Sequence, residues 1–163
     1  MLVCGSIHSW EDRTPCENQR IEVVLETLLD SVSLAEGICT RVARSVGFDE
    51  DDCQNICMAV REAVINAFRY GNQEQREKKI HLTVEVGNDR FVVHILDQGH
   101  GFDLSSVPDP LAEENLLKTS GRGILLMRTF MDEFEVRRTS SGGTWLVMAK
   151  VLPHSPKGAN RPA

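Results

Sequence analysis

An acid, an amide and a base lie at helical spacing in the segment from Met58 to Asn72. Glu62, Asn66 and Arg69 occupy positions i, i+4 and i+7. At about 100° per residue, the second and third side chains lie within roughly 40° of the first, so all three point the same way. A carboxylate can orient a hydroxyl, an amide oxygen can bind Mg²⁺ and a guanidinium can bind phosphate. The face therefore suits a metal-bound polyphosphate, although a solvated helix face with a charge pair would give the same pattern.

Two glycine turns later in the chain have the composition of ligand-binding loops. Asp97–Gly101 has the pattern D-x-G-x-G directly after a strand-like run, and glycine lets a ligand approach the main chain closely. Gly121–Gly123 has the pattern G-x-G directly before a helix-like segment, where free backbone N–H groups and the helix dipole favour an anion. Either turn alone is weak evidence. Together with the polar helix face they favour a site for a metal-bound polyphosphate over a solvated helix face.

The helix that carries the first three residues needs an apolar surface to pack on. The stripe opposite them is apolar and suits a sheet. It consists of Ile56, Ala59, Val60, Ala63, Val64 and Ala67. The acids at 49–52 suit the first turn of this helix, which we expect to run to about Tyr70 with Gly71 as its C-terminal cap.

A second helix is predicted upstream, over residues 34–48. Ser31 or Ser33 offers its N-terminal cap, and Gly47 ends it. The residues expected to face inward are Leu34, Ile38, Val42 and Val46. The run 21–29 before it could be an edge strand or the start of a helix, because its periodicity fits both.

Alternating apolar residues predict two antiparallel hairpins. Residues 80–86 pair with 91–97, and residues 134–138 pair with 144–151. The first strand should bury one face, formed by Ile80, Leu82, Val84 and Val86. Residues 104–120 contain two prolines, an acidic patch and no core pattern, which predicts a mobile lid between the glycine turns.

The order of elements is thus helix, helix, hairpin, lid, helix, hairpin. Antiparallel strands with helices on one side predict an α+β two-layer sandwich with a mixed, mostly antiparallel sheet. No P-loop pattern occurs. We expect this domain over residues 20–152, preceded by an N-terminal extension at 1–19 and followed by a disordered polar tail at 153–163.

Composition narrows the class of protein. The chain has 18 basic and 24 acidic residues, a formal charge of −6, and no basic block, which argues against nucleic-acid binding. No apolar run approaches the roughly 20 residues needed to cross a bilayer, and the N-terminus lacks a signal-peptide pattern. We therefore expect a cytoplasmic protein without membrane attachment. Five cysteines lack metal-ligand spacing and are expected to be reduced thiols.

The motifs in this order resemble the Bergerat ATP-binding fold of the GHKL superfamily. An E-x-x-x-N helix is followed by D-x-G-x-G, then G-x-G before a helix, and finally Gly143-Thr144 on the last hairpin. The segments AVREAVINAFRYGN, LDQGHGFD and SGRGILLMRTFMDEFEV carry the resemblance, which covers about residues 20 to 150. Within that superfamily the chain is most similar to the stand-alone anti-sigma-factor serine kinases of bacterial partner-switching systems.

The resemblance implies a role for each motif residue in binding ATP and Mg²⁺. Asn66 would hold Mg²⁺, Asp97 would accept a hydrogen bond from the adenine amino group, and Thr144 would contact the same edge of adenine. Glu62 would be the general base that orients the attacking serine or threonine hydroxyl of a partner. The other motif residues would hold the phosphates (Arg69, Lys118, Gly121, Arg122 and Gly123) or shape the pocket wall (Gly99 and Gly101).

The implied function is that of a protein serine/threonine kinase. It would phosphorylate a STAS-type anti-sigma antagonist and sequester a sigma factor. Kinase-active members commonly carry a lid arginine where this chain has Lys118 and Thr119, and lysine cannot make bidentate phosphate contacts. The alternatives are therefore a non-catalytic ATP-binding module that sequesters a protein, or a detached histidine-kinase catalytic domain. Members are often homodimers, but spacing alone locates no interface.

Overall fold

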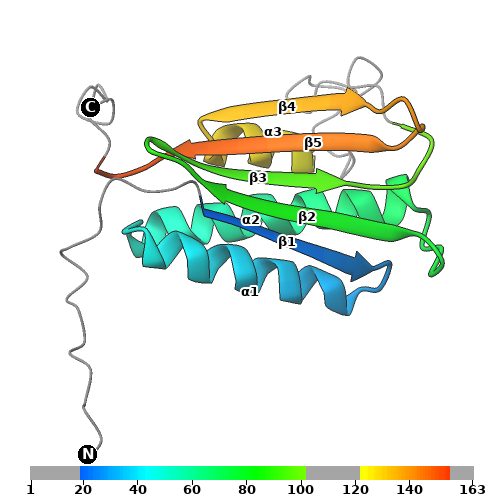
Figure 1. Cartoon of the computed structure of the whole chain (residues 1–163), viewed down its shortest axis with the longest axis horizontal. Helices are drawn as coiled ribbons and strands as arrows, with labels where there is room; N and C mark the ends of the chain where they lie inside the picture. Colours follow the sequence, from blue (N-terminus) through cyan, green and yellow to red (C-terminus); the bar gives the residue numbers. More distant parts are fainter. Residues whose placement is uncertain (1–18, 102–121, 155–163) are drawn as a thin grey trace, which may run out of the picture.

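The computed structural model describes residues 19–101 and 122–154, which form a five-stranded sheet with helices against one face (Figure 1). The strands are β1 (Gln19–Glu26), β2 (Lys79–Val86), β3 (Arg90–Leu96), β4 (Glu133–Arg138) and β5 (Thr144–Val151). Their order is β1-β2-β3-β5-β4, and every pairing is antiparallel. The predicted α+β two-layer sandwich is confirmed, with no parallel pair among the described strands.

Three α-helices make up the second layer in the described part of the chain. They are α1 (Asp30–Ser45), α2 (Glu50–Asn66), which continues into a π-helical turn at Ala67–Gly71, and α3 (Arg122–Phe130). Figure 1 shows α1 beside β1 at one edge of the sheet, and α3 behind β5 and β4 at the other. None of these helices is long and apolar enough to cross a membrane. The predicted lid at 104–120 lies outside the described residues.

The apolar stripe of α2 packs on the sheet as predicted. All six of its members are buried: Ile56, Ala59, Val60, Ala63, Val64 and Ala67. Full burial of each Ile or Val side chain contributes about 1.5–3 kcal/mol. Asp49 caps the helix, because its side chain accepts a hydrogen bond from the Asp52 N–H at 2.8 Å. The polar face with Glu62 is thereby turned away from the sheet.

The prediction for α1 was partly wrong. The helix begins at Asp30 with no side-chain cap, and Ser31 Oγ instead donates to the Glu26 carbonyl at 2.8 Å. Leu34 is 54% exposed. The buried side chains are those of Ser31, Val32, Ala35, Cys39 and Ala43. This inner stripe consists mostly of small residues, which let α1 approach α2 and the sheet closely, while Ile38, Val42 and Val46 flank the core.

The two predicted hairpins are confirmed and carry the rest of the core. Alternate β2 residues face the helices, with Ile80, Leu82, Val84 and Val86 all buried. The ambiguous run before α1 is the edge strand β1, which pairs with β2. Lys150 on β5 is buried, donates to the Phe130 carbonyl at 2.9 Å and pairs with Asp52 at 3.1 Å. This contact fixes the C-terminal end of α3 against the start of α2.

Candidate functional site

Asp97 leaves β3 as a buried carboxylate with one oxygen already engaged. Its Oδ1 accepts hydrogen bonds from the backbone N–H groups of Gly99 and Thr144, both at 2.9 Å. The Asp97 N–H in turn donates to the Thr144 carbonyl at 3.0 Å. Oδ2 accepts no hydrogen bond from a described residue. The carboxylate is thus fixed in orientation and presents one acceptor to a ligand that carries an N–H donor.

Two glycines let the end of α2 lie directly against this carboxylate. A Cβ added to Gly71 would overlap Asp97 Oδ2, and a Cβ added to Gly99 would overlap the Gly71 carbonyl. Gly71 was predicted as a helix cap, yet its φ is not positive; the close approach is what requires glycine there. Gly101, by contrast, has φ +81°, a left-handed backbone conformation that favours glycine.

Asn72 was missed as a site residue, although it anchors the Asp97 loop. It is fully buried. Its Oδ1 accepts from the Gln98 N–H at 2.8 Å, and its Nδ2 donates to Thr27 Oγ1 at 2.8 Å and to the Lys79 carbonyl at 3.1 Å. One amide therefore joins the loop after β3 to the ends of β1 and β2. The Gly-Asn pair that follows a long helix was the available signal in the sequence.

We expect Asn72→Ala to lower the free energy of unfolding by about 2–4 kcal/mol, because three polar partners would lose their hydrogen bonds in a buried place. Urea denaturation monitored by circular dichroism measures this change. Asn88→Ala, at the exposed turn between β2 and β3, is the matched control and should change stability by less than about 0.5 kcal/mol. A loss below about 1 kcal/mol for Asn72→Ala would contradict the anchoring role.

Glu62 lies at the junction of α2 and α3. A Cβ added to Gly123 would lie 2.6 Å from Glu62 Oε2, so the carboxylate rests against the first turn of α3. Glu62 forms no hydrogen bond or ion pair with a described residue. The structure thus brings together two residues that the sequence placed on separate motifs. It leaves the carboxylate available to a hydroxyl that enters beside the start of α3.

Asn66 and Arg69 lie between the Asp97 and Glu62 ends of the site. Asn66 is the last α-helical residue of α2 and is partly exposed, and its side chain forms no hydrogen bond with a described residue. Arg69 is exposed and belongs to the π-helical turn, which is closed by a 2.7 Å bond from the Asn72 N–H to the Ala67 carbonyl. The helix was predicted to remain regular to Tyr70, so the position of Arg69 differs from that expectation. π-helical turns occur frequently at functional sites.

The remaining predicted site residues are only partly covered by the structure. Thr144 is buried at the start of β5, and Arg122 is the first, exposed residue of α3. Lys118 and Gly121 lie outside the described residues. The predicted residues that the structure describes therefore lie in two places, on α2 against α3 and on the loop after β3, and their roles in one site stay a prediction.

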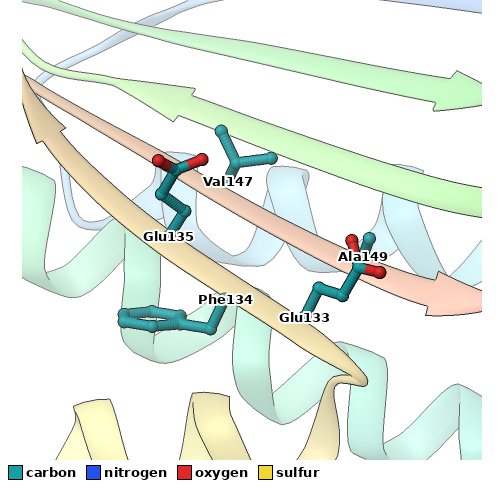
Figure 2. A pocket seen from close by; sticks show the side chains of 5 residues that line it. All are labelled: Glu133, Phe134, Glu135, Val147 and Ala149. Carbon is teal, nitrogen blue, oxygen red and sulfur yellow. The ribbon is translucent and has the colours of Figure 1, made fainter.

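A shallow pocket of about 310 Å³ lies elsewhere, along β4 and β5 (Figure 2). It is lined by Glu133, Phe134, Glu135, Val147 and Ala149. None of the predicted site residues belongs to it, and its two carboxylates would repel an anionic nucleotide. We therefore assign no nucleotide to this pocket.

The described cysteines take no part in the site. Cys39, Cys53 and Cys57 are free thiols, as the sequence predicted. Burial, and to a smaller extent the nearby Cys57, raises the pKa of the Cys39 thiol to about 12. Such a thiol stays protonated at neutral pH and is a poor nucleophile.

Comparison with known proteins shows which family the chain belongs to. Residues 25–150 match the family described as "Histidine kinase-like ATPase domain". The serine-protein kinase RsbW of Staphylococcus epidermidis is 31% identical over 139 residues, which cover 81% of this chain and 86% of that protein. The anti-sigma F factor of Clostridium beijerinckii is 31% identical over 102 residues, 61% of this chain and 71% of that protein.

A solved structure supports the fold independently. The crystal structure of the RsbU and RsbW domains of Rv1364c from Mycobacterium tuberculosis superposes with a TM-score of 0.58 at 14% identity, covering 82% of this chain and 32% of that one. The chain therefore belongs to the histidine kinase-like ATPase domain family, in the group of the serine-protein kinase RsbW.

Proposed function

We propose that this protein is a Mg²⁺-dependent serine/threonine kinase that transfers the γ-phosphoryl group of ATP to a STAS-type anti-sigma antagonist and also binds a sigma factor. The observation that carries the proposal is the position of Glu62. Its carboxylate forms no hydrogen bond or ion pair with a described residue, and it lies against the first turn of α3, at the opposite end of α2's polar face from the Asp97 loop. The names of the relatives, a serine-protein kinase and an anti-sigma factor, support both parts of the proposal.

The Asp97 loop suits the adenine end of ATP. Oδ2 of Asp97 is the acceptor that the adenine amino group requires, and Oδ1 is held by two backbone N–H groups. Thr144 follows Gly143, where a Cβ would overlap the Asp97 carbonyl, so β5 lies close enough for Thr144 to border the same edge of the base. A preorganised acceptor of this kind costs little reorganisation when the ligand binds.

In the part of the site that would hold the ATP phosphates, Asn66 would bind Mg²⁺. Its amide oxygen makes no hydrogen bond with a described residue, and amide oxygens are accepted Mg²⁺ ligands alongside water and phosphate. When bound, Mg²⁺ neutralises charge on the phosphates and on the transferred group. Arg69 and Arg122 would add positive charge beside them, together with Lys118 and the N–H groups of Gly121 and Gly123 at the start of α3.

Glu62 would act on the partner rather than on ATP. Its carboxylate would accept the proton of the partner's serine or threonine hydroxyl while that oxygen attacks the γ-phosphorus. The bond from the γ-phosphorus to the β,γ-bridging oxygen breaks, and ADP leaves with the electron pair. Catalysis of phosphoryl transfer comes mainly from positioning and electrostatic stabilisation, and a general base typically adds about 10²- to 10⁴-fold.

A second function is favoured by one feature of the sequence. Lys118 and Thr119 stand where a lid arginine is common in active kinases of this type. A lysine is a point charge and cannot make bidentate phosphate contacts. The second candidate is therefore an ATP-binding module that sequesters a partner protein without phosphorylating it.

Transfer of phosphate to a partner separates the two candidates. The purified chain, ATP with Mg²⁺ and a STAS-type protein encoded nearby should yield a phosphoserine or phosphothreonine on that protein, detected by mass spectrometry. ATP without the kinase chain is the control. Tight ATP binding with no phosphorylated partner would favour the sequestration module.

The metal role of Asn66 has its own test. Mg-ATP at 100 times its dissociation constant should raise the free energy of unfolding by about 2.7 kcal/mol. We expect Asn66→Ala to remove most of the Mg²⁺-dependent part of this gain, because the amide ligand is lost. Thermal unfolding with ATP, with and without Mg²⁺, measures it, and Asn88→Ala is again the control. An Asn66→Ala protein that gains as much from Mg-ATP as the parent would exclude Asn66 as the metal ligand.

A further inference from the structure

Two arginines end β4, and their side chains lie on opposite faces of the sheet. Val136 packs against the core, so alternation along the strand places Arg138 on the same face, toward the helices. Arg137 lies on the other face, where its guanidinium is 5.4 Å from the centre of the Trp145 ring. Figure 1 shows the ends of β3, β4 and α2 at one end of the molecule. Arg138 is therefore the arginine of this pair on the side where the Asp97 loop meets α2.

The aliphatic stem of Arg138 rests against the far end of the Asp97 loop. A Cβ added to Gly101 would lie 2.5 Å from Arg138 Cγ and 2.7 Å from its Cδ. Arg138 is also the partner of Thr144 in the β4–β5 pair, and the Thr144 N–H donates to Asp97 Oδ1 at 2.9 Å. The loop thus begins at the carboxylate of Asp97 and ends against the side chain of Arg138.

Arg138 and the end of α2 lie on different sides of this loop. A Cβ added to Gly71, the last residue of the π-helical turn, would overlap Asp97 Oδ2, so the helix ends directly beside that oxygen. Gly101, at the other end of the loop, lies against β4 instead. A flat base that donates a hydrogen bond from its amino group to Oδ2 would therefore turn one face to α2 and the other toward β4, where Arg138 lies.

The guanidinium of Arg138 is available to a ligand. Its side chain is exposed and forms no hydrogen bond or ion pair with a described residue. Other arginines in the described part of the chain pair with acidic side chains: Arg20, Arg44, Arg61, Arg90 and Arg137. A guanidinium is planar and stacks on flat rings, including nucleobases. Arg138 therefore has the chemistry to cover a base that is bound at Asp97.

We propose that Arg138 is a further nucleotide-binding residue, whose guanidinium stacks on the face of the adenine ring turned away from α2. The inference rests on the proposed function, which puts the base at Asp97. Position along α2 favours the base over the phosphates. Glu62, beside which the γ-phosphoryl group would react, lies nine residues before Gly71, about 13 Å along the helix at 1.5 Å per residue. Arg138 is held at the Gly71 end, through its contact with Gly101.

A stacked arginine has a role that differs from that of Asp97. The hydrogen bond to Oδ2 depends on the amino group of adenine, whereas stacking depends on the flat face of the ring and tolerates a change of base. Loss of Arg138 should therefore weaken ATP and purine riboside triphosphate, which lacks the amino group, by the same factor. Asp97 would select the base, and Arg138 would add affinity for any purine that enters.

Titration calorimetry of the full chain with Mg-ATP, and with adenosine by displacement of Mg-ATP, tests the inference. Adenosine has the base without the phosphates, so it isolates the contact with the ring. Arg138→Ala should weaken the binding of both ligands by the same factor, about tenfold. Arg138→Lys should recover little of the loss for adenosine, because an ammonium group is a point charge without a flat face.

Arg137→Ala is the matched control. It removes the same charge from the neighbouring residue of β4, whose side chain lies on the other face, so the binding of both ligands should not change. An equal loss in Arg137→Ala and Arg138→Ala would show an effect of net charge and overturn the inference. Arg138→Ala should unfold at the same urea concentration as the parent, because the side chain is exposed. If it unfolds earlier, Arg138→Lys, which keeps the stem against Gly101, decides by its affinity for adenosine.

The remaining outcomes separate this inference from the proposed function. Unchanged affinities in Arg138→Ala, or a loss for Mg-ATP without a loss for adenosine, would show that Arg138 does not contact the base. An Arg138→Lys protein that binds adenosine as well as the parent does would exclude stacking. A parent that bound neither ligand would overturn the proposed function as well, whereas the other results leave it standing.

Discussion

Asp97→Asn is expected to weaken ATP binding by about 100-fold or more while the protein stays folded. Two backbone N–H groups, from Gly99 and Thr144, point at Oδ1, so the side-chain oxygen of asparagine must take that place. Its NH₂ group is then forced into the place of Oδ2, where it faces the amino group of adenine. A hydrogen bond to a charged acceptor, worth about 1.5–3 kcal/mol, is replaced by two donors that oppose each other.

Isothermal titration calorimetry with ATP and with purine riboside triphosphate, which lacks the amino group, gives the sharpest form of this test. The parent should prefer ATP strongly, and Asp97→Asn should show little preference. Urea denaturation serves as the control for folding, because both bonds to Oδ1 can be kept by the amide oxygen. If the variant still preferred ATP as strongly as the parent does, Asp97 would not be the residue that recognises the adenine amino group.

The parts of the site that could be predicted from the sequence are those fixed by local pattern. The apolar stripe of α2 has a single helical period, so its burial and the outward direction of Glu62 follow from it. The D-x-G-x-G turn directly follows a mostly apolar run, which places Asp97 at the end of β3. On α2, rotation of the helix by one residue would expose apolar side chains, so few alternatives compete.

Tertiary contacts decided the features that sequence patterns missed. On α1, two stripes have helical spacing, and the one that contains Ala35, Cys39 and Ala43 is buried because its small side chains permit close packing. Leu34 belongs to the other stripe. The π-helical turn and the role of Asn72 likewise depend on partners distant in sequence, among them Gln98, Thr27 and Lys79. A pattern within residues 58–72 cannot predict these contacts, because the partner residues lie elsewhere in the sequence.

Glu62→Gln is expected to lower the rate of phosphate transfer to the partner by about 10²- to 10⁴-fold. The affinity for nucleotide should change by less than about threefold. Glutamine has the shape of glutamate, but it cannot accept the proton of the attacking hydroxyl. Glu62 rests against Gly123 rather than the Asp97 loop, so the adenine contacts should be unaffected. Single-turnover kinetics with a STAS-type partner measures the rate, and calorimetry with ADP measures the affinity.

Two further variants distinguish loss of the base from loss of structure. Glu50→Gln changes an exposed acid at the start of the same helix, where it pairs with Arg44, and should leave the transfer rate unchanged. Gly123→Ala keeps the base but adds a Cβ 2.6 Å from its Oε2. The flexible carboxylate can move aside, so stability should hold while misplacement by about 1 Å slows transfer by roughly 10²-fold. Transfer at the parent rate in Glu62→Gln would exclude Glu62 as the base, whatever the effect of Gly123→Ala.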